Sequence, residues 1–213
     1  MSEAPKYYPT FISLTGRDCL VIGGGTVAQR KIETLLECQA RVRVISPQVV
    51  SRVAELAAAG SIELVDRGYA EGDLDGAFLV VSATNDAAVN QQVSLEAARR
   101  GQLINMVDDP DHSNFIVPAT LNRGDITIAV STAGTSPALA RRIKHDIEES
   151  IGAEYADVAK LVGGVRRNLL DRGISISPEK WQAALDLEEL TGLVRNGRGQ
   201  QAAEILLTKL VED

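Results

Sequence analysis

A glycine-rich loop at residues 23–28 (GGGTVA) directly follows the apolar run at residues 19–22 (CLVI). A strand, then such a loop, then a helix is the arrangement typical of dinucleotide-binding domains. Glycines leave room for a pyrophosphate, and free backbone N–H groups at the start of the helix attract its charge. The alternative is a plain strand-to-helix turn. We predict that the cofactor contacts Gly23, Gly24, Gly25, Thr26 and Val27.

The end of the expected second strand lacks the acid that usually holds the adenine ribose in NAD-binding domains. Ser46 and Pro47 stand there instead. Ser46 could bond a ribose hydroxyl, so we include both residues in the predicted cofactor site. The nearby cation Arg43 could bind the 2′-phosphate of NADP. These residues alone therefore do not decide between NAD and NADP.

Asp108 follows the expected fifth strand, and ligands of open α/β sheets bind at the carboxyl ends of the strands. Asp109, Asp111 and His112 stand close by in the sequence. A carboxylate near others can acquire a raised pKa and act as a general base. Asp108 is therefore a candidate catalytic base. The alternative is that the three acids form a solvated turn around Pro110.

A second anion site is indicated at residues 134–137 (GTSP), where Ser136 is placed to cap a helix that Pro137 begins. The start of a helix attracts anions, and basic residues including Arg141 follow on the same helix. Beside a dinucleotide-binding domain, such a site would suit a polycarboxylate substrate, with Ser136 and Arg141 as contacts. The alternative is an ordinary capped helix with a basic outer face.

An alternation of strands and helices must position these residues. We expect strands at residues 19–22, 42–45, 62–65, 77–81 and 103–107, and helices at 26–37, 49–59 and 85–100, the last capped by Asn85 and ended by Gly101. Such alternation predicts a doubly wound parallel sheet with right-handed crossovers.

The pattern changes after residue 112. β-like runs at 115–118 and 126–131 are joined by a turn at 122–125, and helices are expected after residue 136 and at 153–171, 178–195 and 199–211. We therefore predict an α/β fold in three parts: a parallel-sheet domain (residues 1–113), a small α+β region (114–150) and a helical C-terminal region (151–213).

Composition excludes several classes of protein. The 213 residues carry 22 basic and 29 acidic side chains, a formal net charge of −7, which argues against a general binder of nucleic acid or anionic membranes. No apolar run approaches the roughly 20 residues that cross a bilayer, and no signal peptide is visible, so we expect a cytoplasmic protein. The two cysteines, Cys19 and Cys38, have no metal-binding spacing. We expect two free buried thiols and no metal site.

Several motifs, in this order, resemble the precorrin-2 dehydrogenase family, which includes the N-terminal module of siroheme synthases. The matching pieces are Tyr8-Pro9 with Phe11, Leu14 and Arg17; residues 19–31; Ala83-Thr84-Asn85-Asp86 with Val89-Asn90; Asn105-Met106-Val107-Asp108; residues 115–119; and residues 128–132 leading to Gly134-Thr135-Ser136-Pro137. The likeness spans about residues 8–150.

The resemblance implies a Rossmann-like domain that oxidises precorrin-2 to sirohydrochlorin with NAD, since the absent acid after the second strand also fits this family. It implies Thr84 and Asn85 as cofactor contacts, Asn105 as a substrate contact and Asp108 as the active-site base. It further implies a homodimer formed through residues 115–150. Some members also insert Fe²⁺ into sirohydrochlorin and others do not, so chelation stays open.

A competing hypothesis is a non-catalytic regulatory module that senses NAD. Such a module would bind the dinucleotide and change conformation without turnover, and Asp108 would have no special role in it. The joint presence of the glycine loop, Asp108 and the segment at 134–137 favours the enzyme.

Overall fold

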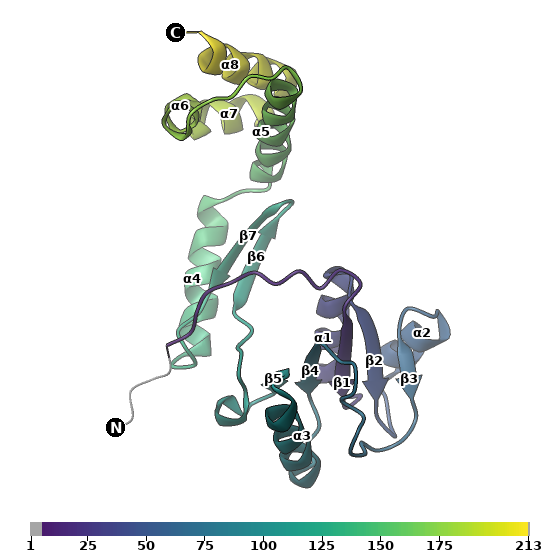
Figure 1. The fold of residues 1–213 in the computed structure, drawn as a ribbon. Helices are drawn as coiled ribbons and strands as arrows, with labels where there is room; N and C mark the ends of the chain where they lie inside the picture. The colour runs from purple at the N-terminus through teal and green to yellow at the C-terminus, as the bar shows by residue number, and fades with distance from the viewer. Residues whose placement is uncertain (1–5, 213) are drawn as a thin grey trace. The chain divides into compact units, whose positions relative to one another are not determined.

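The computed structural model describes residues 6–212. The chain forms two compact units, and the boundary between them along the chain lies between Val117 and Pro118 (Figure 1). The first unit contains the parallel sheet, and the second contains a β-hairpin and the C-terminal helices. The further division at residue 150 stays a prediction.

The first unit is built on a five-stranded sheet with the strand order β3-β2-β1-β4-β5, in which every neighbouring pair is parallel. Its elements are β1 (Asp18–Ile22), α1 (Thr26–Glu37), β2 (Arg41–Ile45), α2 (Ser51–Ala58), β3 (Glu63–Val65), β4 (Leu79–Ser82), α3 (Ala87–Arg100), β5 (Leu103–Met106) and a 3-10 turn, η1 (Pro110–His112). The predicted doubly wound sheet is confirmed.

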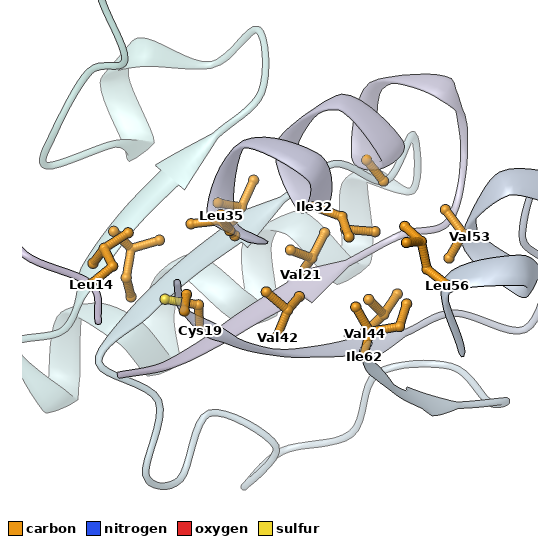
Figure 2. Packing of buried hydrophobic residues seen from close by; sticks show 14 residues of the cluster. Leu14, Cys19, Val21, Ile32, Leu35, Val42, Val44, Val53, Leu56 and Ile62 are labelled. Carbon is orange, nitrogen blue, oxygen red and sulfur yellow. The ribbon is translucent and has the colours of Figure 1, made fainter. Parts of the chain in front are cut away.

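Helices cover both faces of this sheet. On one face, Val21 of β1 and Val42 of β2 pack beneath Ile32 and Leu35 of α1 and Leu56 of α2 (Figure 2). The opposite face carries a second apolar cluster beneath α3. It includes Val93 and Ala97 of α3 and the strand residues Leu20, Val80 and Ile104. Side chains alternate along a strand, so Leu20 and Val21 enter different layers. This explains why the central strands are apolar throughout.

The second unit begins with an antiparallel hairpin of β6 (Ala119–Arg123) and β7 (Ile126–Val130). Helix α4 (Pro137–Ser150) packs on this hairpin, and Arg123 of β6 joins the two, with its Nη2 3.2 Å from Glu148 Oε1. The remaining helices are α5 (Glu154–Asp171), α6 (Pro178–Ala184), α7 (Leu187–Arg195) and α8 (Gly199–Val211), which enclose their own apolar core. Among the described helices, none is long and apolar enough to cross a membrane.

Two predicted elements of secondary structure are wrong. The run at 115–118 is not a strand, because side-chain bonds hold this stretch beside β5: Asn114 Oδ1 accepts from the N–H of Ile104 and Asn105 Nδ2 donates to the carbonyl of Phe115. The helix expected at 178–195 is two helices, since Asp186 caps α7 by accepting from the N–H of Glu189 at 3.0 Å.

The expectation of two buried thiols is half correct. Both cysteines are free, but only Cys19 is buried, because Cys38 lies at the exposed C-terminal cap of α1. Burial raises the pKa of the Cys19 thiol to about 11, so this thiol stays protonated and packs as an apolar side chain.

The helix α3 is capped by Asp86, not by Asn85 as the sequence suggested. The Asp86 carboxylate accepts from the N–H groups of Ala88 and Val89, at 2.9 and 3.2 Å, whereas Asn85 is exposed. Gly101 ends the helix as predicted, in the left-handed region with φ 62°.

Loss of this cap should weaken the fold measurably. We expect Asp86→Ala to lower the free energy of unfolding by about 1 kcal/mol, since two N–H groups lose their acceptor. Chemical denaturation measures the change, and Asn85→Ala is the matched control with no expected effect. Equal destabilisation by both variants would contradict the assignment of the cap.

Candidate active site

The first two glycines of the loop are required by close packing of the backbone. Gly23 has φ 111°, and a Cβ atom there would lie 2.4 Å from the carbonyl oxygen of Ala83. A Cβ atom on Gly24 would lie 2.3 Å from the carbonyl oxygen of Gln48. These glycines therefore allow β1 and its loop to meet the loops that follow β4 and β2.

Gly25 differs from its neighbours because a Cβ atom there would meet no other atom within 4 Å. It is the N-cap residue of α1, and no side chain caps this helix. The N–H groups of Thr26 and Val27 in the first turn are thus free to bind an anion, and the space in front of them is open. The loop fits the pyrophosphate of a dinucleotide, and the contacts of Gly25, Thr26 and Val27 with it stay predictions.

Ser46 and Pro47 follow β2 at the carboxyl edge of the sheet, beside the glycine loop. Ser46 is buried, and its hydroxyl donates to the carbonyl oxygen of Gln48 at 2.6 Å. The hydroxyl thus shapes the loop that packs on Gly24. Pro47 is exposed. The proposed contact of Ser46 with a ribose stays a prediction.

Thr84 and Asn85 lie in the loop after β4, next to Gly23. Thr84 Oγ1 accepts from the N–H of Asp86 at 3.2 Å, and the Thr84 carbonyl accepts from Asn90 Nδ2 at 3.1 Å. Asn90 Oδ1 in turn accepts from the hydroxyl of Ser82, at 2.7 Å. Asn90, which the sequence did not single out for a role, therefore holds this loop against the glycine loop.

Asp108 and Asp109 differ sharply in their surroundings. The Asp109 carboxylate accepts from the backbone N–H of His112 at 3.3 Å and lies 2.7 Å from the Nδ1 atom of the same histidine, so it stabilises η1. Asp108 is exposed, has φ 60°, and makes no hydrogen bond or ion pair with any residue of the described chain. Its carboxylate, two residues past the end of β5, is free to meet a ligand.

Asn105, on β5, contacts the first helix. It is buried on the α1 face of the sheet, with its Nδ2 donating to the carbonyl of Phe115 at 3.2 Å. Its Oδ1 accepts from Lys31 Nζ at 3.5 Å. Both ends of the amide are thus engaged within the protein, and a direct contact of Asn105 with substrate stays a prediction.

Lys31 is a site residue that the sequence analysis quoted without giving it a role. It is half-buried, and burial and the adjacent Arg30 lower its pKa while the Asp108 carboxylate raises it, with a net downward shift. A signal was present in the sequence: Ala28, Lys31, Ile32 and Leu35 have the spacing of the buried stripe of a helix, and a lysine is foreign to such a stripe.

Ser136 and Arg141 belong to the second unit. Ser136 caps α4 as predicted, accepting from the N–H of Leu139 at 3.2 Å, and its backbone is held by Thr132 Oγ1. Arg141 is exposed and forms no ion pair among residues 6–212. Their roles as substrate contacts stay predictions.

Fold and loop together define an NAD(P)-binding α/β domain, and comparison with known proteins agrees. Residues 10–119 match the family model described as putative NAD(P)-binding, and residues 123–150 match the model described as sirohaem biosynthesis protein central.

Similar proteins come from siroheme biosynthesis. A siroheme synthase of Thioalkalivibrio sulfidiphilus is 39% identical over 202 residues, which are 94% of this chain and 41% of that protein. One from Photorhabdus laumondii is 36% identical over 206 residues, 96% of this chain and 44% of that protein. The chain thus spans less than half the length of these relatives.

A solved structure is similar over nearly its whole length. It is SirC, a precorrin-2 dehydrogenase, with a TM-score of 0.76 and 30% identity, covering 94% of this chain and 98% of that chain. The chain belongs to the precorrin-2 dehydrogenase family, which contains SirC and the N-terminal part of siroheme synthases.

Proposed function

We propose that the protein oxidises precorrin-2 to sirohydrochlorin with NAD, in the cytoplasm, as a step of siroheme biosynthesis. The observation that carries the proposal is the Asp108 carboxylate at the carboxyl end of β5, which no residue among 6–212 pairs, in the same unit as the N-terminus of α1, which no side chain caps. Similarity to SirC names the substrate class. In a module that only senses NAD, the Asp108 carboxylate, exposed on a left-handed backbone, would have no role.

Different residues of this chain would bind the cofactor and react with the substrate. The first turn of α1 would bind the pyrophosphate, and the loops held by Ser46 and Asn90 would fix the position of the dinucleotide. Asp108 would accept the proton that the substrate loses. A bound nicotinamide would supply the hydride acceptor. The substrate would thus lose a proton to Asp108 and a hydride to the cofactor.

We favour NAD over NADP because arginines near the end of β2 are already engaged. Arg43 donates to the carbonyl oxygen of Asp73 at 2.6 Å, and Arg67 forms two bonds of 2.7 Å with the Asp73 carboxylate. Arg52 on α2 is paired with Glu33 and Glu55. A 2′-phosphate would need a free cation here. Comparing kcat/KM for NAD and NADP tests this preference, and a higher value for NADP would contradict it.

Insertion of Fe²⁺ into sirohydrochlorin is a second candidate activity, because the unpaired Asp108 carboxylate could also accept pyrrole protons. Similarity to siroheme synthases supports it. The test adds Fe²⁺ anaerobically to sirohydrochlorin with and without the protein and follows the siroheme spectrum. An unchanged rate would exclude chelation by this chain.

We also propose a homodimer formed through the hairpin and α4. Each strand of the hairpin has one edge that pairs with no other strand of the described chain, and α4 exposes Leu139 and Ile143, which are one turn apart. We expect Leu139→Glu combined with Ile143→Glu to raise the dimer dissociation constant about tenfold or more, as measured by analytical ultracentrifugation. Leu170→Glu, at another exposed leucine, is the control. A wild-type monomer, or an unchanged constant in the double variant, would overturn this interface.

A further inference from the structure

Lys31 presents a half-buried charge that no described residue neutralises. Within the described residues, Asn105 Oδ1 is its one hydrogen-bond acceptor, at the long distance of 3.5 Å, and no carboxylate lies within salt-bridge distance of Nζ. An ammonium has three protons to donate, and partial burial without a counter-ion is unfavourable. Fold stability alone does not account for a lysine at this position.

The direction of the side chain separates Lys31 from the pyrophosphate site. Lys31 lies five residues after Thr26, about 7.5 Å farther along the helix axis. Its Nζ meets Asn105 on β5, which is separated from β1 by β4 and therefore lies about 10 Å from β1 across the sheet. The ammonium thus points toward the edge where Asp108 follows β5, away from the first turn of α1.

The charge on Lys31 is also coupled to the candidate base. The Asp108 carboxylate is near enough to raise the pKa of Lys31, in opposition to burial and Arg30, without forming an ion pair. An anionic group of a ligand placed between them would favour the ammonium form. Precorrin-2 carries acetate and propionate side chains around its ring, so a substrate positioned at Asp108 would supply such a group.

We propose that Lys31 binds a carboxylate side chain of the tetrapyrrole substrate and thereby orients the ring toward Asp108. This inference rests on the proposed oxidation of precorrin-2. Asn105 would act as the positioning residue, since its amide is anchored at the Phe115 carbonyl and its Oδ1 lies 3.5 Å from Lys31 Nζ. A charge-assisted bond of this kind orients the substrate as well as binding it.

The test compares Lys31→Met, Lys31→Arg and Arg30→Met in anaerobic steady-state assays. Arg30 is the matched control, because it is an exposed cation one position earlier on the same helix. We expect Lys31→Met to raise KM for precorrin-2 about tenfold or more, with KM for NAD within about twofold of the wild type. Lys31→Arg should restore most of the loss, and Arg30→Met should match the wild type.

Two further readouts separate binding from a structural role. Thermal unfolding of Lys31→Met should occur at the same or a higher temperature, since the variant removes an unpaired half-buried charge. Titration with sirohydrochlorin, the polycarboxylate product, should show weaker binding to Lys31→Met and a smaller dependence on salt. A lowered melting temperature with unchanged sirohydrochlorin binding would mean that the lysine only supports the fold, and would overturn the proposal.

The outcomes distinguish this inference from the proposed function. If the wild type does not oxidise precorrin-2, the proposed function fails, and the substrate assigned to Lys31 fails with it. If the wild type oxidises precorrin-2 and Lys31→Met has an unchanged KM for it, only the inference about Lys31 is overturned. A rise in KM for NAD alone would assign Lys31 to the cofactor and equally overturn it.

Discussion

Replacing Asp108 by Asn is expected to lower kcat for precorrin-2 oxidation by roughly 10²–10⁴-fold, the range typical for loss of a general base. The amide keeps the size and shape of the carboxylate but cannot accept the substrate proton. Stability should change little, because Asp108 makes no bond within the described chain and Asn also tolerates its φ of 60°. Stopped-flow or steady-state absorbance of NADH measures the rate.

The neighbouring acids provide the control for that experiment. Asp111→Asn removes an exposed carboxylate three residues away and should leave kcat within about twofold of the wild type. NAD binding should be unchanged in both variants. If Asp108→Asn and Asp111→Asn have equal activity, the three acids are a solvated turn, and the role of Asp108 as a base is wrong.

Alanine at two glycines of the loop should separate folding from cofactor binding. Gly23→Ala places a Cβ atom 2.4 Å from the carbonyl oxygen of Ala83 at a backbone with φ 111°. We expect roughly 3 kcal/mol or more of destabilisation, from overpacking and backbone strain together. Denaturant titration of the purified variant measures this loss, and a yield too low for purification would itself agree with it.

Gly25→Ala should weaken cofactor binding more than folding, because its Cβ atom would meet no atom of the described residues within 4 Å. The variant should stay folded and lose at most about 1 kcal/mol of stability, because Ala is a poorer N-cap residue than Gly, but its methyl group would occupy the space in front of α1. We expect NAD binding to weaken about tenfold or more, a loss of roughly 1.4 kcal/mol, measured by calorimetric titration. Unchanged affinity for NAD in a folded Gly25→Ala variant would show that the pyrophosphate does not bind at this helix.

The elements of the first unit could be predicted because their signals are local. Continuous apolar runs with a glycine loop after the first of them specify a buried parallel sheet, and α1 has the bounds that the sequence predicted. Both the cap at Ser136 and the stop at Gly101 were likewise identifiable from short-range chemistry.

Other features depend on partners that are distant in the chain. The stretch at 115–118 has the composition of a strand, but side chains of Asn105 and Asn114 bind it to β5 and leave it irregular. The sequence allowed Arg43 to bind a 2′-phosphate, but in the structure it donates to the carbonyl of Asp73, thirty residues later in the chain. The helical spacing marks Lys31 as unusual, but the direction of its side chain depends on Asn105, 74 residues away in the chain.

The central claim is tested most directly by anaerobic incubation of the purified protein with precorrin-2 and NAD, with the absorbance of NADH and the spectrum of sirohydrochlorin followed together. We predict that both products appear in equal amounts in the wild type and are nearly absent in Asp108→Asn. NAD binding without formation of either product, in a folded wild-type protein, would contradict the enzyme and favour a module that senses the dinucleotide.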